Sequence, residues 1–321
     1  MLTAYTGHNK TGPFTTPDDI RNAIDQIIWI DMEQPTREEE LFVEDLLKTS
    51  IPTRDEMIEI ELSNRLYIED NNLYATASIV TKAGELDPEI HAITFVVVEQ
   101  RLITLRYSDP KPFKLFIKDF NRVPFSNGLQ VFAALQETIV NRMADILEMA
   151  AHHIDDISVI LFRRKDMASP KTNFDEILRN IGIHGDLVSK ARESLVSINR
   201  LISFVSQSPN FKNETDKHTH FQMLLRDIQA LNDHATFMNS KISFLLDATL
   251  GMVSIEQNTI IKIFSVAAVI FLPPTLVASI YGMNFHFMPE LDWHFGYPMA
   301  IGLMILSAFV PYKFFKKKGW L

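Results

Sequence analysis

Two long apolar segments stand at the C-terminal end of the chain, after a large hydrophilic body. The first runs from about Ile260 to Tyr281 and the second from about Trp293 to Tyr312. No Asp, Glu, Lys or Arg occurs between Ile263 and Pro289. At about 1.5 Å per residue, each segment can cross a hydrocarbon core of ~30 Å as a helix. The pattern therefore predicts an integral membrane protein with a short helical hairpin.

Residues 1–125 mix strand and helix signals. Thr36 and Glu39 have the spacing of a capping box, which predicts that a helix begins there. Asp70-Asn71-Asn72 is a good hairpin turn between two strand-like runs. Short apolar runs typical of strands stand at 27–30, 66–69, 73–80, 93–99 and 102–107. We therefore expect an α/β domain with a core of its own.

Helical periodicity replaces this pattern from about residue 126. Apolar residues at steps of three and four predict helices over 129–162 and from about 174 to 205. A third pattern begins near Asp216 and continues into the first apolar segment, which gives a helix of roughly 60 residues, ~90–100 Å long. Pro273 and Pro274 should kink this helix or break its hydrogen-bond ladder. The expected divisions are a long-helix region and stalk at 126–259, spans at 260–281 and 293–313, a loop at 282–292 and a tail at 314–321.

Charge is distributed unevenly along the chain. From residue 260 onward, five lysines oppose Glu290 and Asp292, which gives this part a net charge of +3. Since the whole chain has a net charge of −9, residues 1–259 have a net charge of −12. An acidic body argues against nucleic acid as a partner and favours cations. The chain has no cysteine, which excludes disulfides and Cys-ligated metal sites.

The flanks of the two spans predict how the protein is oriented. The loop between them has no Lys or Arg, whereas Lys262 lies at the start of the first span and four lysines follow the second. By the positive-inside rule, both termini are cytoplasmic and the loop faces outward. The N-terminus lacks the features of a cleaved signal peptide.

One face of the first span combines small, polar and apolar residues. Steps of three or four along this face pass through Asn258, Ile261, Phe264 or Ser265, Ala268, Leu272, Thr275 and Ser279, and end near Tyr281. In a ring of subunits such a face could line a pore. Packing of small residues between helices explains Ala268 and Ser279 equally well.

The residues after the first span resemble a known signature. Tyr281-Gly282-Met283-Asn284-Phe285, followed by Met288-Pro289-Glu290-Leu291, is similar to the signature of the CorA family of divalent-cation transporters, and to its enterobacterial-type members in particular. Ile255–Asn258, Phe271–Thr275 and Lys316–Leu321 add to the resemblance. The close similarity covers residues 251–321, and upstream it is one of architecture.

The resemblance implies a funnel-shaped homopentamer in the inner membrane, whose five first spans line the pore. It implies Mg²⁺ as the main substrate, Co²⁺ and Ni²⁺ as further ones, and closure by intracellular Mg²⁺. Gly282, Met283 and Asn284 would form the selectivity filter, and Asp227 matches an acidic position of a regulatory interface. The sequence itself has no Gly-rich phosphate loop and no nucleophile elbow, so we expect no enzyme activity and no organic cofactor.

The chemistry of Mg²⁺ fits these residues. Mg²⁺ holds its waters tightly, and a ring of Asn284 amide oxygens with the Gly282 carbonyls can accept hydrogen bonds from them. Gly282 allows a close backbone approach or a positive φ. Glu290 and Asp292 would concentrate cations at the mouth. Large apolar residues on the pore face, Ile261, Phe264 and Leu272, could close the pore by expelling water.

Two other functions stay open beside this one. A zinc transporter of the ZntB type shares the architecture, and a non-conducting membrane-anchored scaffold or sensor would need only the hairpin. Two groups of His and Asp, at 152–156 and 216–220, could in principle hold a metal ion, although solvated or helix-capping side chains explain them better.

Overall fold

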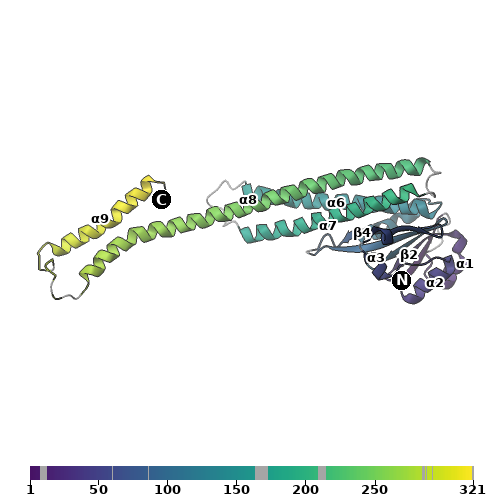
Figure 1. The fold of residues 1–321 in the computed structure, drawn as a ribbon, viewed down its shortest axis with the longest axis horizontal. Coiled ribbons are helices and arrows are strands. Elements are labelled where there is room, and N and C mark those ends of the chain that lie inside the picture. Colours follow the sequence, from purple (N-terminus) through teal and green to yellow (C-terminus); the bar gives the residue numbers. More distant parts are fainter. Residues whose placement is uncertain are drawn as a thin grey trace. The chain divides into compact units, whose positions relative to one another are not determined.

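The computed structural model describes residues 1–7, 13–59, 61–85, 87–162, 173–208, 215–283, 286, 288–290 and 292–319. The chain divides into two compact units, Met1–Leu246 and Asp247–Leu321. The first contains a six-stranded sheet and helices α1 to α7 (Figure 1). The second contains the end of the long helix α8 (Thr215–Tyr281) and α9 (Gly296–Lys317).

The sheet has the strand order β1-β2-β6-β5-β4-β3. Strands β2 and β6 are parallel, and all other neighbours are antiparallel. Asp70 and Asn71 both have positive φ, which is what a tight hairpin between β3 and β4 requires. The predicted α/β fold is confirmed. The strands are β1 (Leu2–Thr6), β2 (Ile27–Glu33), β3 (Leu66–Glu69), β4 (Asn72–Thr81), β5 (Glu89–Val98) and β6 (Arg101–Arg106).

Short helices cover one face of the sheet. Side chains of β1, β2, β5 and β6 on this face form one hydrophobic core with Ile20 of α1, Val43 of α2 and Met57 of α3. Thr36 caps α2 through the predicted capping box with Glu39. The helices are α1 (Pro17–Asn22), α2 (Arg37–Leu47), α3 (Arg54–Ile58) and α4 (Leu62–Arg65), with a short 3₁₀ turn, η1 (Ile24–Gln26), before β2.

Longer helices cover the other face. Trp29 of β2 lies against Phe116 and Phe120, and Phe95 of β5 makes an edge contact with Phe132 of α6. The Ser78 amide of β4 donates to Ser197 Oγ of α7 at 2.9 Å. The elements are α5 (Lys111–Asp119), the 3₁₀ turn η2 (Phe120–Arg122), α6 (Gly128–Phe162) and α7 (Phe174–Gln207).

A buried ion pair joins the two parallel strands. Asp31 of β2 and Arg106 of β6 have side chains only 3% exposed, and Arg106 Nη2 donates to Asp31 Oδ2 at 2.8 Å. Thr104 Oγ1 donates to Asp31 Oδ1 at 2.7 Å, and Trp29 Nε1 donates to Thr104 at 3.0 Å. Asp31 raises the pKa of Arg106 against the opposing effect of burial. The charges are compensated, so the pair is tolerated inside the core.

Two features of the last two helices bear on the membrane hairpin. Helix α8 has 67 residues and remains one helix through Pro273 and Pro274. Proline removes a donor, but its fixed φ is compatible with a helix, and Thr275 Oγ1 adds a bond to Phe271 O at 2.7 Å. Helix α9 begins at Gly296, three residues after the expected start, because the Gly296 amide first closes a turn onto Trp293 O.

The buried ion pair generates a test of stability. We expect Asp31→Asn to lower the free energy of unfolding by about 3 kcal/mol, because it leaves a buried guanidinium with too little negative charge. The Glu33 side chain, the second carboxylate that contacts Arg106, is 31% exposed. Glu33→Gln should therefore lower the free energy of unfolding by less than about 1 kcal/mol. Thermal unfolding of the purified variants measures both. Equal losses of unfolding free energy in the two variants would contradict the claim that the buried Asp31 stabilises the fold more than the partly exposed Glu33.

Candidate functional site

One face of α8 within the second unit is shielded. Val266 is 2% exposed, and Ile270, Val277 and Tyr281 are half-buried. On α9, shielded residues recur at the same helical spacing, namely Gly296, Ala300, Met304, Ser307 and Pro311. Figure 1 shows the two helices running in opposite directions. The shielded faces are therefore the ones along which the hairpin packs.

The opposite face of α8 is exposed. Phe264 is 71% exposed and Leu272 is 64% exposed. At about 100° per residue, this face lies roughly 180° around the helix from the shielded one. The predicted pore-facing residues on it are Asn258, Ile261, Phe264, Leu272 and Thr275, all exposed, and Ser265, Ala268 and Ser279 share it.

Tyr281 is an exception among the predicted pore residues. It is half-buried and follows Val266, Ile270 and Val277 around the helix, on the face that packs in the hairpin. Its position at the end of α8 puts it next to the signature, but its side chain does not share the face of Thr275. Lys262 also lies away from that face, at about 100° per residue from its neighbours.

The signature begins where α8 ends. Gly282 is exposed, and the Gly282 amide donates to Ala278 O at 2.9 Å. Its φ is outside the left-handed region, so the alternative of a positive φ is wrong; an added Cβ would lie 3.0 Å from Ala278 O. Met283 is exposed. Asn284, the central residue of the predicted filter, lies outside the described residues, as does Phe285.

The loop between the helices depends on a second glycine. A Cβ added at Gly296 would lie 2.1 Å from Glu290 O, so the loop backbone can approach α9 only because this residue is glycine. Glu290 and Asp292 are both exposed. Their carboxylates are free to act on cations in the surrounding solvent.

Among the residues that the structure describes, the candidate metal groups are not assembled. Among the described residues, no three His, Asp or Glu side chains gather closely enough to hold an ion. His153 stacks on His184 with ring centroids 4.5 Å apart, and Asp155 pairs with Lys241. Burial and the neighbouring His153 lower the pKa of His184. Asp227 is exposed on α8, and the side chains of Asp216 and His218 lie outside the described residues.

These features define a class of protein. Two helices are long and apolar enough to cross a membrane, and they follow a large hydrophilic α/β unit. A two-span helical membrane protein whose first span carries its polar side chains on one exposed face is suited to transport. Residues 25–317 match the family model described as CorA-like Mg²⁺ transporter protein. The chain belongs to this family.

Sequence similarity to named relatives extends over nearly the whole chain. The magnesium transport protein CorA of Pasteurella multocida (strain Pm70) is 37% identical over 308 residues, which cover 95% of each chain. That of Escherichia coli (strain K12) is 35% identical over 297 residues, 92% of each. The complete structure of the CorA magnesium transporter from Methanocaldococcus jannaschii has a TM-score of 0.75 at 17% identity and covers 100% of this chain and 99% of that one. At that identity it shows the shared fold alone.

Proposed function

We propose that the protein is a homopentameric channel for Mg²⁺ uptake across the inner membrane, with Co²⁺ and Ni²⁺ as secondary substrates. The observation that carries the proposal is the similarity, over 95% of the chain, to relatives named as magnesium transport proteins. In the proposed orientation both termini are cytoplasmic and residues 282–292 face outward. Metal flux into proteoliposomes that contain only this protein tests it directly.

The exposed face of α8 is the proposed pore lining. Apolar residues elsewhere on the helix can face lipid, but contact with lipid is energetically unfavourable for a face that carries Asn258, Thr275 and Ser279. The Thr275 hydroxyl gives its proton to Phe271 O and keeps its oxygen lone pairs as acceptors for water. In a ring of five copies, this face would surround a path for hydrated cations.

Asn284 is the proposed centre of the filter. Its amide oxygen would accept hydrogen bonds from the first-shell waters of Mg²⁺, together with the backbone carbonyl of Gly282. Neutral oxygens would let ions pass the filter quickly, because a ring of carboxylates would bind a divalent ion too strongly to release it. Glu290 and Asp292, both exposed, would raise the cation concentration at the mouth.

Feedback by intracellular Mg²⁺ is the proposed control. Each copy of residues 1–259 carries −12, so five copies repel one another unless cations screen them. Asp227 is an exposed carboxylate in the first unit and is the proposed contact for a bridging ion between copies. Loss of that ion would let the copies separate and wet the apolar residues of the pore face.

Two other functions are less well supported. Zinc transport of the ZntB type is compatible with the fold, but the relatives that match along the whole chain are named for magnesium. A non-conducting scaffold needs no polar face on a membrane-length helix. Flux measured separately for Mg²⁺ and Zn²⁺ distinguishes all three.

We expect Asn284→Ala to reduce Mg²⁺ flux to the background of empty liposomes while the oligomer still assembles, because the mutation removes the amide oxygens of the proposed filter and keeps the backbone. His286→Ala, two residues further along the loop, is the matched control and should conduct normally. Flux with an internal fluorescent indicator and size-exclusion chromatography give the two readouts. Normal uptake by a correctly assembled Asn284→Ala protein would refute the assignment.

We also expect Phe264→Ser and Leu272→Ser to leak at high internal Mg²⁺, because a hydroxyl keeps water in a constriction that apolar side chains would empty. Ile263→Ser, which replaces an exposed residue away from the pore face, is the control and should stay closed. Efflux from Mg²⁺-loaded proteoliposomes measures the leak. If both pore-face variants assemble and leak no more than the parent, the gate lies elsewhere.

A further inference from the structure

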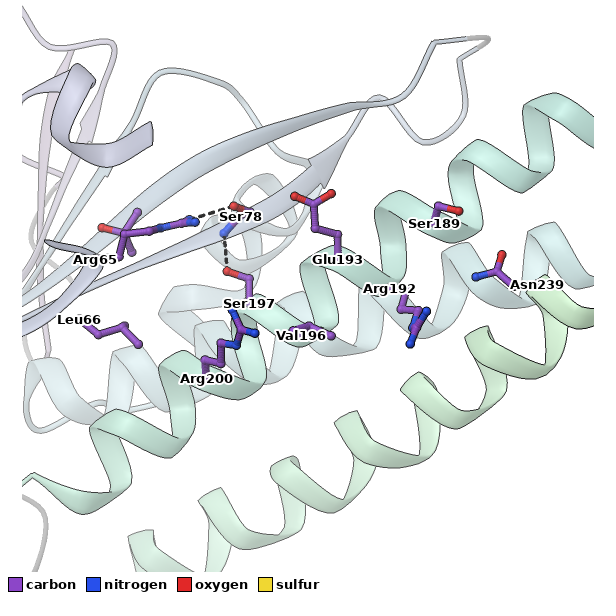
Figure 2. A pocket seen from close by; sticks show the side chains of 11 residues that line it. Arg65, Leu66, Ser78, Ser189, Arg192, Glu193, Val196, Ser197, Arg200 and Asn239 are labelled. Carbon is purple, nitrogen blue, oxygen red and sulfur yellow. Dashed lines mark hydrogen bonds between the residues drawn. The ribbon is translucent and has the colours of Figure 1, made fainter. Parts of the chain in front are cut away.

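A cavity of about 340 Å³ lies within the first unit, between the sheet and the long helices (Figure 2). Its walls come from the junction of α4 and β3, from β4, from α7 and from Asn239 of α8. The polar side chains on which its chemistry depends are Arg65, Ser78, Arg192, Glu193, Ser197 and Arg200. No part of the proposed ion pathway lies here, so this cavity needs a different explanation.

The cavity is positively charged although the body around it is acidic. Arg65, Arg192 and Arg200 line it, and Glu193 is the only carboxylate among its lining residues, so they carry a net +2. Within the described part of the chain, none of these three guanidinium groups lies within 4.0 Å of a carboxylate, unlike Arg37 or Arg106. The cavity therefore holds uncompensated positive charge.

Arg65 is the most constrained of the three. It is half-buried, and its Nη2 donates to Ser78 Oγ at 2.8 Å (Figure 2). Its Nε is buried and has no hydrogen-bond partner among the described residues. Burial lowers the pKa of Arg65, and Arg200 acts in the same direction while Glu193 opposes it. A buried donor without a partner costs free energy that a bound acceptor would recover.

The remaining polar groups suit an acceptor-rich ligand. A guanidinium group offers five N–H donors and no acceptor, in a planar fork that matches phosphate oxygens. Ser197 Oγ accepts from the Ser78 amide, so its own hydroxyl proton is available to a ligand. The volume is within the range of sites for small molecules.

We propose that this cavity binds a small phosphate-bearing anion, held by the guanidinium groups of Arg65, Arg192 and Arg200. Glu193, which directly follows Arg192 in the sequence of α7, would repel the anion and limit its affinity. Because the cavity lies wholly within the first unit, binding does not depend on the proposed function of the second.

Calorimetric titration of the purified full-length protein in detergent with EDTA tests the proposal. The probes are inorganic phosphate, pyrophosphate and ATP, which separate free phosphate from a phosphate ester. We expect Arg192→Gln and Arg200→Gln each to weaken binding about tenfold, since each removes a charge-assisted contact. Glu193→Gln should tighten it. Arg179→Gln, which removes an exposed arginine of α7 outside the cavity, is the matched control and should change nothing.

Three results would overturn the proposal. The first is that none of the probes binds the parent protein. The second is that Arg179→Gln weakens binding as much as Arg192→Gln, which would mean attraction by general charge. The third is that Arg192→Gln and Arg200→Gln leave binding unchanged but dissociate the oligomer, which would assign these arginines to carboxylates of a second copy. Both arginines are exposed, so their variants should fold.

Discussion

A helix inside a membrane has no water along most of its surface, and this constraint accounts for the uneven composition of α8. Apart from the two carbonyls that face Pro273 and Pro274, its backbone is satisfied within the helix, and Val266, Ile270 and Val277 are shielded on the side where the hairpin packs. The opposite side carries Thr275 and Ser279, which one hairpin alone would expose to lipid. Several copies arranged around a wet path remove this conflict, which is why the proposed function requires an oligomer.

Local signals in the sequence predicted most of the fold. The capping box of Thr36 and the turn at Asp70-Asn71 act over a few residues, and both are present in the structure. Strand β1 was missed because its five residues have no distinctive pattern and are held by pairing with β2, more than twenty positions away. The adjacent prolines of α8 remove two backbone donors, and the helix continues through them to Tyr281, where the sequence pattern predicted its end.

The candidate site was predictable only where it is contiguous in sequence. The residues after Tyr281 form a motif, whereas the side of α8 that is shielded follows from contacts that periodicity does not reveal. Tyr281 lies on that side, although the sequence pattern grouped it with Thr275. The basic cavity joins residues near 65–78 to residues near 189–200, which only long-range packing brings together. Its one local signal, Arg192 and Arg200 at helical spacing on α7, looks like any solvated helix face.

The central claim is that one face of α8 is in contact with water while the opposite face is packed. Because the chain has no cysteine, single cysteines can be placed on either face and exposed, in membranes, to a hydrophilic thiol reagent. We expect fast labelling of Thr275→Cys and Ser279→Cys, and protection of Ile270→Cys and Val277→Cys. Equal labelling of both faces, or labelling of the second pair alone, would contradict it.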